Sequence, residues 1–250
     1  AHAAGAGGGT YGNRIGAATV YENYLAVFPD DSAARDRAAS LLLEEGRYDQ
    51  ASILVADRPV TEKGRLVSAC QMIRGSNWQE AEAILRDIIV SNPLDPMVII
   101  QLSRCLAARR AFAEARALLD KGRKANPGYP ALENEVNAVE FAYATHLSET
   151  GDLKEALAYY RRLVKLEPDN PRYLLNLGHA EMMNGEFSLA ISHFRKGLKL
   201  TPGEDWARSG LAYSLMREWD FDGAIREMKL LLAKGDDPDY LLQLGSMYNQ

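Results

Sequence analysis

The feature that most constrains the fold of this chain is a four-residue phrase that returns at a nearly constant spacing. Five copies begin with an aromatic residue, one begins with leucine, and all six end in alanine. The alanines are separated by 30, 34, 41, 34 and 34 residues. They are Ala51, Ala81, Ala115, Ala156, Ala190 and Ala224. A period of this length predicts an array of small units that stack on one another, because no single unit can bury its own apolar face.

Two other residue types recur at a fixed distance from these alanines. A small residue lies twelve positions before each alanine, and a proline follows four of them by the same distance. The small residues are Ala39, Ala69, Ser103, Ala144, Gly178 and Ala212, and the prolines are Pro93, Pro127, Pro168 and Pro202. Small side chains let two helices cross closely, and proline ends a helix because the residue before it avoids the α region. The phase therefore predicts two helices in each unit, packed together through the small residues.

This pattern resembles the tetratricopeptide repeat family, whose helix-turn-helix unit has a small residue at its eighth position, alanine at its twentieth and proline near its thirty-second. The clearest match is the unit that contains Leu177, Gly178 and Ala190. The tryptophan at the family's fourth position is mostly replaced here, by Ile99 and Leu174 in two units. The resemblance covers about seven units and implies an all-α solenoid of stacked helix pairs, wound into a right-handed superhelix.

Two departures from the common spacing preserve the helical phase. The spacing of 30 residues is about one helical turn short, and the spacing of 41 is about two turns long. We expect Pro59 to shorten the second helix of the unit that begins its phrase at Tyr48. The extra turns are expected in a long helix from about Pro130 to Glu149. An Asp or Asn before a proline predicts a capped helix start at Asp95, Asn170 and Asp237.

The two ends of the chain depart from the repeat. Residues 1–12 are rich in glycine and alanine and lack the lysine of a phosphate-binding loop, so we expect a flexible segment there. The predicted array spans residues 13–250, and Ala17 with Pro29 marks a degenerate first unit. Leu244 and Gly245 begin a last unit that the sequence does not complete, which favours an array that is truncated or continues.

Charge and hydropathy exclude two classes of partner. The chain has 29 Lys and Arg against 34 Asp and Glu, a formal net charge of −5, whereas a broad nucleic-acid footprint needs a basic excess. No apolar run approaches the roughly 18 residues of a membrane span. We therefore expect neither nucleic-acid binding nor membrane insertion, and the compartment stays open between the cytoplasm and a bacterial periplasm.

Residues with catalytic or metal-binding chemistry form no recognisable motif. Cys70 and Cys105 are not part of a CxxC pair, and the four histidines form neither HxxxH nor HExxH. Acidic residues recur before the repeat alanines, which is typical of solvated residues in the first turn of a helix. These are Glu80, Glu114 and Glu155. We predict a protein that is not an enzyme and that needs no cofactor or metal.

The resemblance implies where a partner would bind. In the family, the first helices of successive units line the concave side of the superhelix, with six positions of each unit facing it. The residues at such positions that we predict to bind a partner are Phe141, Arg172, Leu175, Asn176, His179, Met182, Met183, Trp206, Tyr213, Met216 and Arg217. Thr145 and Glu149 share these positions. In earlier units the same positions hold Leu66, Cys70, Ile73, Arg74, Met97, Ile100, Gln101 and Arg104.

Two interpretations of these side chains fit the sequence. The methionines and aromatic residues are either core that packs between units, or an apolar groove that adapts to varied partners. Asn176 either bonds the backbone of a peptide or is simply solvated. If the groove is real, Arg172 and Arg217 flank its apolar part and favour a segment that carries some acidic residues.

The carboxylate clamp that some family members use for chaperone tails is essentially absent here. Asn176 fits the middle position of that clamp. Phe141 and Thr145 stand at its first two positions, and Trp206 and Gly210 stand at its last two. Chaperone tails are therefore disfavoured as partners.

The sequence predicts a scaffold that holds a peptide or an amphipathic helix of another protein in the groove. The alternative is a targeting or regulatory arm of a larger protein, such as a glycosyltransferase or a bacterial component of polysaccharide export or secretion.

Overall fold

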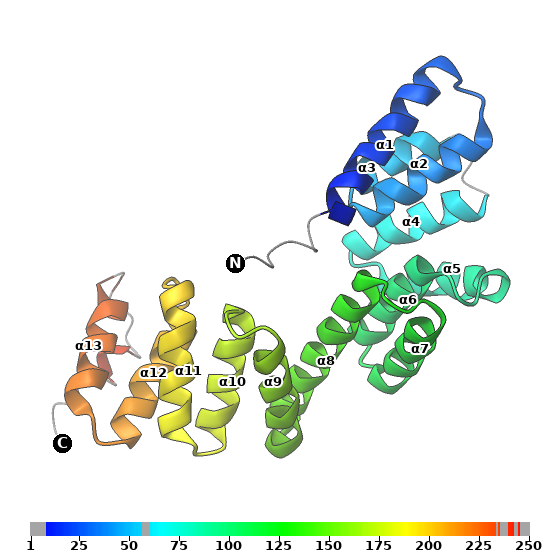
Figure 1. The fold of residues 1–250 in the computed structure, drawn as a ribbon. Coiled ribbons are helices and arrows are strands. Elements are labelled where there is room, and N and C mark those ends of the chain that lie inside the picture. The colour runs from blue at the N-terminus through cyan, green and yellow to red at the C-terminus, as the bar shows by residue number, and fades with distance from the viewer. Residues whose placement is uncertain (1–8, 57–60, 234, 236–239, 243–244, 246–250) are drawn as a thin grey trace, which may run out of the picture. The chain divides into compact units, whose positions relative to one another are not determined.

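The computed structural model describes residues 9–56, 61–233, 235, 240–242 and 245, and these residues form α-helices and no β-strand (Figure 1). Within them, thirteen helices of eight or more residues follow one another. Their bounds are α1 (Gly9–Val27), α2 (Ser32–Glu44), α3 (Tyr48–Val55), α4 (Glu62–Arg74), α5 (Trp78–Ser91), α6 (Pro96–Ala108), α7 (Phe112–Ala125), α8 (Pro130–Thr150), α9 (Leu153–Leu166), α10 (Pro171–Met183), α11 (Phe187–Leu200), α12 (Asp205–Arg217) and α13 (Phe221–Leu232). The predicted all-α class is confirmed.

Helices α2 to α13 form six pairs, and each pair is one repeat of the sequence. The first helix of a pair carries the small residue and the second carries the alanine. All six repeat alanines have 0% exposed surface, and the six small residues are buried. A Cβ on Gly178 would lie 3.3 Å from the carbonyl oxygen of Ala190. The two backbones therefore cross too closely for a larger residue, which confirms the predicted packing.

The turn inside each pair uses one residue in the left-handed region, because that conformation closes a helix end. In three turns this residue is a glycine, and in the other three it is Ser76 (φ 62°), Arg110 (φ 63°) or Trp219 (φ 64°). After α4, the amide of Asn77 donates to the Met72 carbonyl at 2.8 Å. The amide of Ser76 itself donates to the carbonyl of Ile73 at 3.0 Å. Left-handed conformations strain residues other than glycine, so these three turns hold local strain.

The two irregular spacings change helix length as predicted. Helix α3 has 8 residues where α5 has 14, although Pro59 itself lies outside the described residues. Helix α8 has 21 residues where α10 has 13. The predicted caps at Asp95 and Asn170 are confirmed, since each side chain accepts from two backbone amides of its helix. Asp237 lies outside the described residues.

At the beginning of the chain, helix α1 starts earlier than the sequence predicts. It begins at Gly9, so residues 9–12 of the segment expected to be flexible are helical, and residues 1–8 lie outside the described residues. Ala18 has 0% exposed surface, whereas its neighbour Ala17 is half-buried. Within the described residues, the degenerate first repeat thus contributes one helix, α1. Its register differs by one residue from the prediction.

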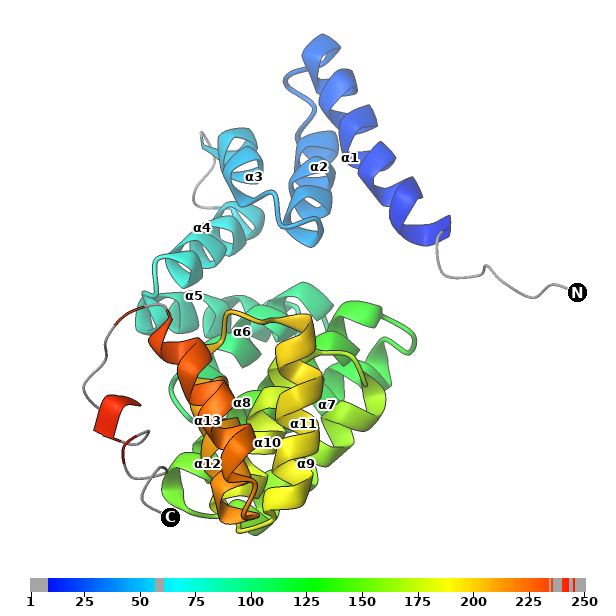
Figure 2. The same ribbon diagram turned by 90° about the vertical axis from the view of Figure 1, so that its left-hand side faces the viewer.

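The chain divides into two compact units, residues 1–139 and 140–250, with the boundary inside α8. In the second unit, α11, α12 and α13 lie side by side in both views (Figure 2). The core there is built around Phe194 of α11, which has 0% exposed surface. Its ring fills the space beside two glycines, since a Cβ on Gly178 would lie 3.2 Å from it and one on Gly210 would lie 2.8 Å away.

Candidate partner-binding groove

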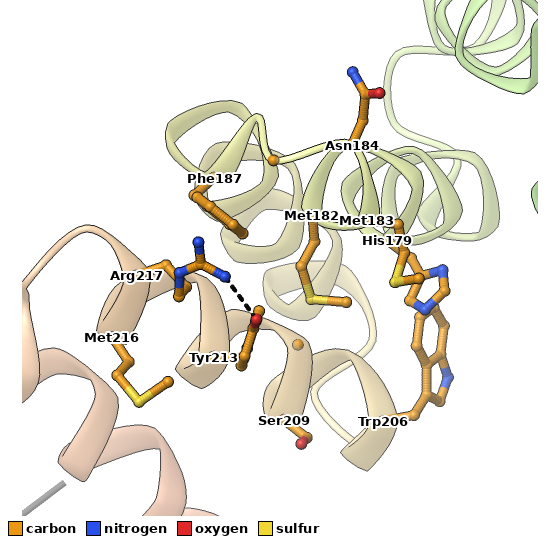
Figure 3. Close-up of a pocket in the computed structure, with 12 residues that line it drawn as sticks. His179, Met182, Met183, Asn184, Phe187, Trp206, Ser209, Tyr213, Met216 and Arg217 are labelled. Atoms are coloured by element: carbon orange, nitrogen blue, oxygen red, sulfur yellow. Dashed lines mark hydrogen bonds between the residues drawn. The ribbon is translucent and has the colours of Figure 1, made fainter. Parts of the chain in front are cut away.

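A cavity of about 1080 Å³ opens in the second unit between α10, α11 and α12 (Figure 3). We call it the C-terminal groove. Its lining residues are His179, Met182, Met183, Asn184, Gly185, Phe187, Trp206, Ser209, Gly210, Tyr213, Met216 and Arg217. Seven of the residues predicted to bind a partner are in this set. On α12, Trp206, Tyr213 and Arg217 recur at a spacing that places them on one helix face.

The structure separates groove residues from core residues among the methionines and aromatic side chains. Met183 is 58% exposed, Trp206 is 44% exposed and Tyr213 is 40% exposed. Met182 and Met216 are half-buried and pack against the apolar core of the second unit while also lining the groove. The groove therefore has an exposed aromatic rim and a floor of flexible thioether side chains, which suits apolar partners of varied shape.

Two aromatic pairs form opposite sides of the C-terminal groove (Figure 3). His179 meets Trp206 edge to face with ring centroids 6.1 Å apart, and Phe187 meets Tyr213 in the same way at 6.1 Å. The indole nitrogen of Trp206 donates to Oε2 of Glu204 at 2.9 Å, which fixes the indole ring. Burial lowers the pKa of His179, so its ring is neutral at pH 7.

Arg217 lies across the ring of Phe187. Its guanidinium carbon is 4.4 Å from the centroid of the Phe187 ring and 5.7 Å from that of the Tyr213 ring. One guanidinium nitrogen also donates to the hydroxyl of Tyr213 at 2.8 Å. Among the described residues, no carboxylate forms an ion pair with Arg217. The groove thus holds a cation that is fixed by aromatic contacts rather than by an acidic neighbour.

A second, smaller cavity of about 300 Å³ adjoins the C-terminal groove. Its lining residues are Thr145, Ser148, Glu149, Tyr160, Asn176, His179 and Trp206. Both cavities are lined by His179 and Trp206, so that aromatic pair lies where they meet. The accessible surface therefore extends from α12 past α10 to the end of α8, all within the second unit.

The remaining predicted residues lie in different surroundings. Asn176 lines the second cavity, and its amide nitrogen donates to the carbonyl of Arg172 in its own helix at 2.8 Å. Arg172 lies over the ring of Phe141 at 4.7 Å, and the Phe141 ring is 5.4 Å from that of Tyr173. Arg172 and Phe141 line neither cavity described above. They form a separate cation–aromatic contact.

Leu175 does not fit the predicted surface. It is 3% exposed and belongs to the core cluster of the second unit. A Cβ on Gly197 of α11 would lie 2.7 Å from Leu175 Cγ, so the leucine side chain occupies the space that this glycine leaves. We correct the interpretation of Leu175 as a groove residue, since it packs α10 against α11.

At the equivalent positions in the first unit, four of the eight residues are buried. Leu66, Cys70 and Ile100 are each 3% exposed or less. Arg104 forms an ion pair with Glu135 at 2.8 Å. Burial raises the pKa of Cys70 to about 12, so this thiol is not available as a thiolate nucleophile at neutral pH. The C-terminal groove is therefore the better candidate surface.

Phe187 is a groove residue that the sequence interpretation missed. It begins the repeated phrase that ends at Ala190, and this position is not one of those that face the concave side in the family. The ring is only half-buried and carries Arg217 on one face. Ser209 was also missed, although it lies 34 residues after Leu175 and therefore stands at a repeat position that faces the concave side in the family.

Neither a metal centre nor a membrane helix is found within the described ranges. No group of three or more His, Cys, Asp and Glu side chains there is placed to hold a metal ion. None of the helices described is both long and apolar enough to cross a bilayer.

A model of the tetratricopeptide repeat family matches residues 73–130 and 141–205. Among curated proteins, cellulose synthase operon protein C of Pseudomonas fluorescens (strain SBW25) is 28% identical over 181 residues, which are 70% of this chain and 14% of that protein. The protein O-mannosyl-transferase TMTC1 of Homo sapiens is 29% identical over 177 residues, which are 69% of this chain and 20% of that protein. The chain thus spans only a small part of these relatives.

Solved structures share the fold of this chain. A MamA chain of Desulfovibrio magneticus RS-1 that runs from residue 41 to its end superposes with a TM-score of 0.55 at 21% identity, covering 69% of this chain and 93% of that one. YrrB, described as a TPR protein with an unusual peptide-binding site, superposes with a TM-score of 0.56 at 14% identity, covering 80% of this chain and 97% of YrrB. Because the sequence identity is low, these superpositions show only that the helix pairs are arranged in the same way.

Proposed function

Because the chain is a tetratricopeptide repeat protein, we propose that it is a non-enzymatic scaffold that holds a segment of a partner protein in the C-terminal groove. The observation that carries this proposal is the rim of exposed aromatic side chains around a cavity of about 1080 Å³. Apolar side chains that stay exposed around a cavity typically mark a binding surface.

The chemistry of the groove supports a peptide or an amphipathic helix as the bound segment. Edge-to-face contacts leave part of the Trp206 and Tyr213 surfaces open, and tryptophan, tyrosine and arginine are the residues that dominate binding energy at interfaces. Met182 and Met216 can change rotamer to fit an incoming side chain at small cost. The second cavity offers space for the same segment to continue towards α8.

The description of YrrB also favours a peptide ligand. It reports a peptide-binding site on a related array of helix pairs. Our proposal for this chain rests on its own groove residues, and YrrB supplies only the precedent that a repeat array of this kind binds peptides.

A photo-cross-linking experiment tests the proposal. A benzophenone amino acid placed at Ser209, inside the groove, should capture the partner, whereas the same amino acid at the exposed Ser192 of α11 should not. Mass spectrometry of the adduct identifies the partner segment, which is then synthesised for affinity measurements.

Two tryptophans make a matched pair for those measurements. Trp206→Ala should weaken binding by about 10-fold or more, the effect of removing an interface hot spot. Trp219→Ala should have little effect, because Trp219 is 76% exposed and does not line the groove. Equal affinity of the two variants, with both fully folded, would contradict binding in the groove.

The alternative, an arm of a larger protein, is favoured by the relatives. One is a cellulose synthase operon protein and another a protein O-mannosyl-transferase, and the chain matches 14% and 20% of their lengths. Sequencing the full reading frame separates the two proposals. A transferase or exporter domain in the same frame favours the arm, and a frame that encodes the array alone contradicts it.

A further inference from the structure

Arg217 is held in place before any partner arrives. Its guanidinium lies 4.4 Å from the centroid of the Phe187 ring and donates to the hydroxyl of Tyr213 at 2.8 Å. A guanidinium has five N–H groups, so most of its donors remain after the bond to tyrosine. Because the side chain is already ordered, less conformational entropy is lost when a ligand binds to it.

Charge is distributed unevenly along the accessible surface. Figure 3 shows Arg217 and Phe187 on one side of the groove and Trp206 with His179 on the other. The Glu204 carboxylate accepts from the Trp206 indole on that second side. Beyond it, Glu149 lines the second cavity, and His179 is neutral because burial lowers its pKa. An acidic group of a ligand is therefore attracted to the Arg217 side and repelled from the Trp206 side, where the Glu204 carboxylate lies.

We propose that Arg217 is a specificity-determining residue that binds an acidic side chain within the partner segment, with an apolar residue of that segment seated beside it between Met182 and Tyr213. This inference rests on the proposed function, since it assumes that the groove holds a segment of a protein. It adds the direction of the segment: the acidic side chain lies at the α12 side, and neutral or basic residues run towards α8.

An internal side chain fits the site better than a chain terminus. A carboxylate that ends a chain is usually enclosed by several donors on different helices, whereas the described groove offers one arginine for this role. Arg217 can present two parallel N–H groups to one carboxylate, a geometry that lysine cannot reproduce. The aromatic rings on one face of the guanidinium also limit the water that competes for these donors.

The experiment uses the full chain and a phage-displayed library of random peptides. Selected peptides should contain Asp or Glu next to an apolar residue. Synthetic copies are compared with copies in which the acidic residue is changed to Gln or Asn. Copies with an amidated C-terminus separate a side-chain carboxylate from a terminal one, and we expect amidation to leave the affinity unchanged.

A charge exchange gives the decisive comparison. Arg217→Glu should lower the affinity for the acidic peptide by about 10-fold or more. A peptide with Lys in place of the acidic residue should bind this variant again. Arg226→Glu is the matched control, since Arg226 is exposed on α13, does not line the groove and has no ion-pair partner among the described residues. We expect it to leave both affinities within about 2-fold.

The outcomes separate this inference from the proposed function. Peptides that depend on Trp206 but show no preference for acidic residues, or an Arg217→Glu variant that the Lys peptide does not rescue, would overturn the role of Arg217 alone. Loss of binding when the C-terminus of the peptide is amidated would show that Arg217 binds a chain terminus. That result would also overturn the role proposed for Arg217. If no selected peptide depends on Trp206, both the proposed function and this inference fail.

Discussion

Replacing Gly210 with alanine should destabilise the second unit, even though alanine is the better helix former. A Cβ at this position would lie 2.8 Å from Cζ of Phe194. The ring cannot easily move away, because it has 0% exposed surface and a Cβ on Gly178 would already lie 3.2 Å from it. The structure therefore predicts a clash in a part of the core that has no spare volume.

Two opposing contributions set the change in the free energy of unfolding that Gly210→Ala causes. Overpacking a filled core costs about 1–3 kcal/mol. The higher helix propensity of alanine returns about 1 kcal/mol. We expect a net loss of up to about 2 kcal/mol, which lowers the melting temperature of a chain of this size by up to about 8 °C.

The assay compares thermal and urea unfolding of Gly210→Ala with those of Gly16→Ala. Gly16 lies in α1, is exposed and has no atom within 4 Å of the position of a new Cβ. Its replacement should stabilise the protein by about 0.5–1 kcal/mol. Phe194→Leu should relieve the clash, so the double variant should lose less stability than the two single changes add up to. If both glycine variants shift stability in the same direction, the close packing around Phe194 is wrong.

Three further predictions concern local features. Ser76→Gly should stabilise by about 1 kcal/mol, because glycine removes the strain of a φ of 62°; a lower urea midpoint than that of the parent chain would count against this. Asp95→Ala should cost about 1 kcal/mol through loss of the cap on Met97 and Val98, whereas Asp169→Ala, at an exposed pair with Lys196, should stay within about 0.5 kcal/mol. Because burial lowers the pKa of His179 below its unfolded value, the folded state takes up this proton less readily, and stability falls as the pH drops below about 6.5. His179→Gln should reduce the change in urea midpoint between about pH 7 and pH 5, and an unchanged slope would show that other groups cause it.

The sequence predicts the fold well because the same short pattern of residues occurs in six successive units. The alanine in each second helix and the small residue in each first helix are sufficient to place the helix crossings. Ala190 and Gly178 lie where that phase requires. The length of α8 follows from the same count, because seven extra residues nearly complete two helical turns. Local periodicity does not locate the start of α1, where the repeat is degenerate.

The groove is less predictable because its residues depend on neighbouring helices. The repeat position of Leu175 suggests an exposed residue, but Gly197 on α11 opens a space that the leucine fills. The phase of Phe187 does not place it on the concave side, yet its ring lies against Arg217 in the groove. The sequence alone does not show that Arg217 meets the ring of Phe187, or that Arg104 meets the Glu135 carboxylate, because each partner lies on another helix. Tyr213 and Trp206 both line the groove, because they share one face of a single helix.

The central claim, that a partner segment binds in the C-terminal groove, can be tested by labelling the tryptophans with fluorine. The chain has three of them: Trp78 in the first unit, Trp206 in the groove, and Trp219 exposed outside it. Fluorine NMR of the full chain is recorded during a titration with the synthetic partner peptide that cross-linking identifies. It reports on all three positions at once. The account predicts that the Trp206 resonance shifts with saturation while those of Trp78 and Trp219 stay in place. A saturable shift at Trp78 or Trp219 with an unchanged Trp206 resonance would contradict it.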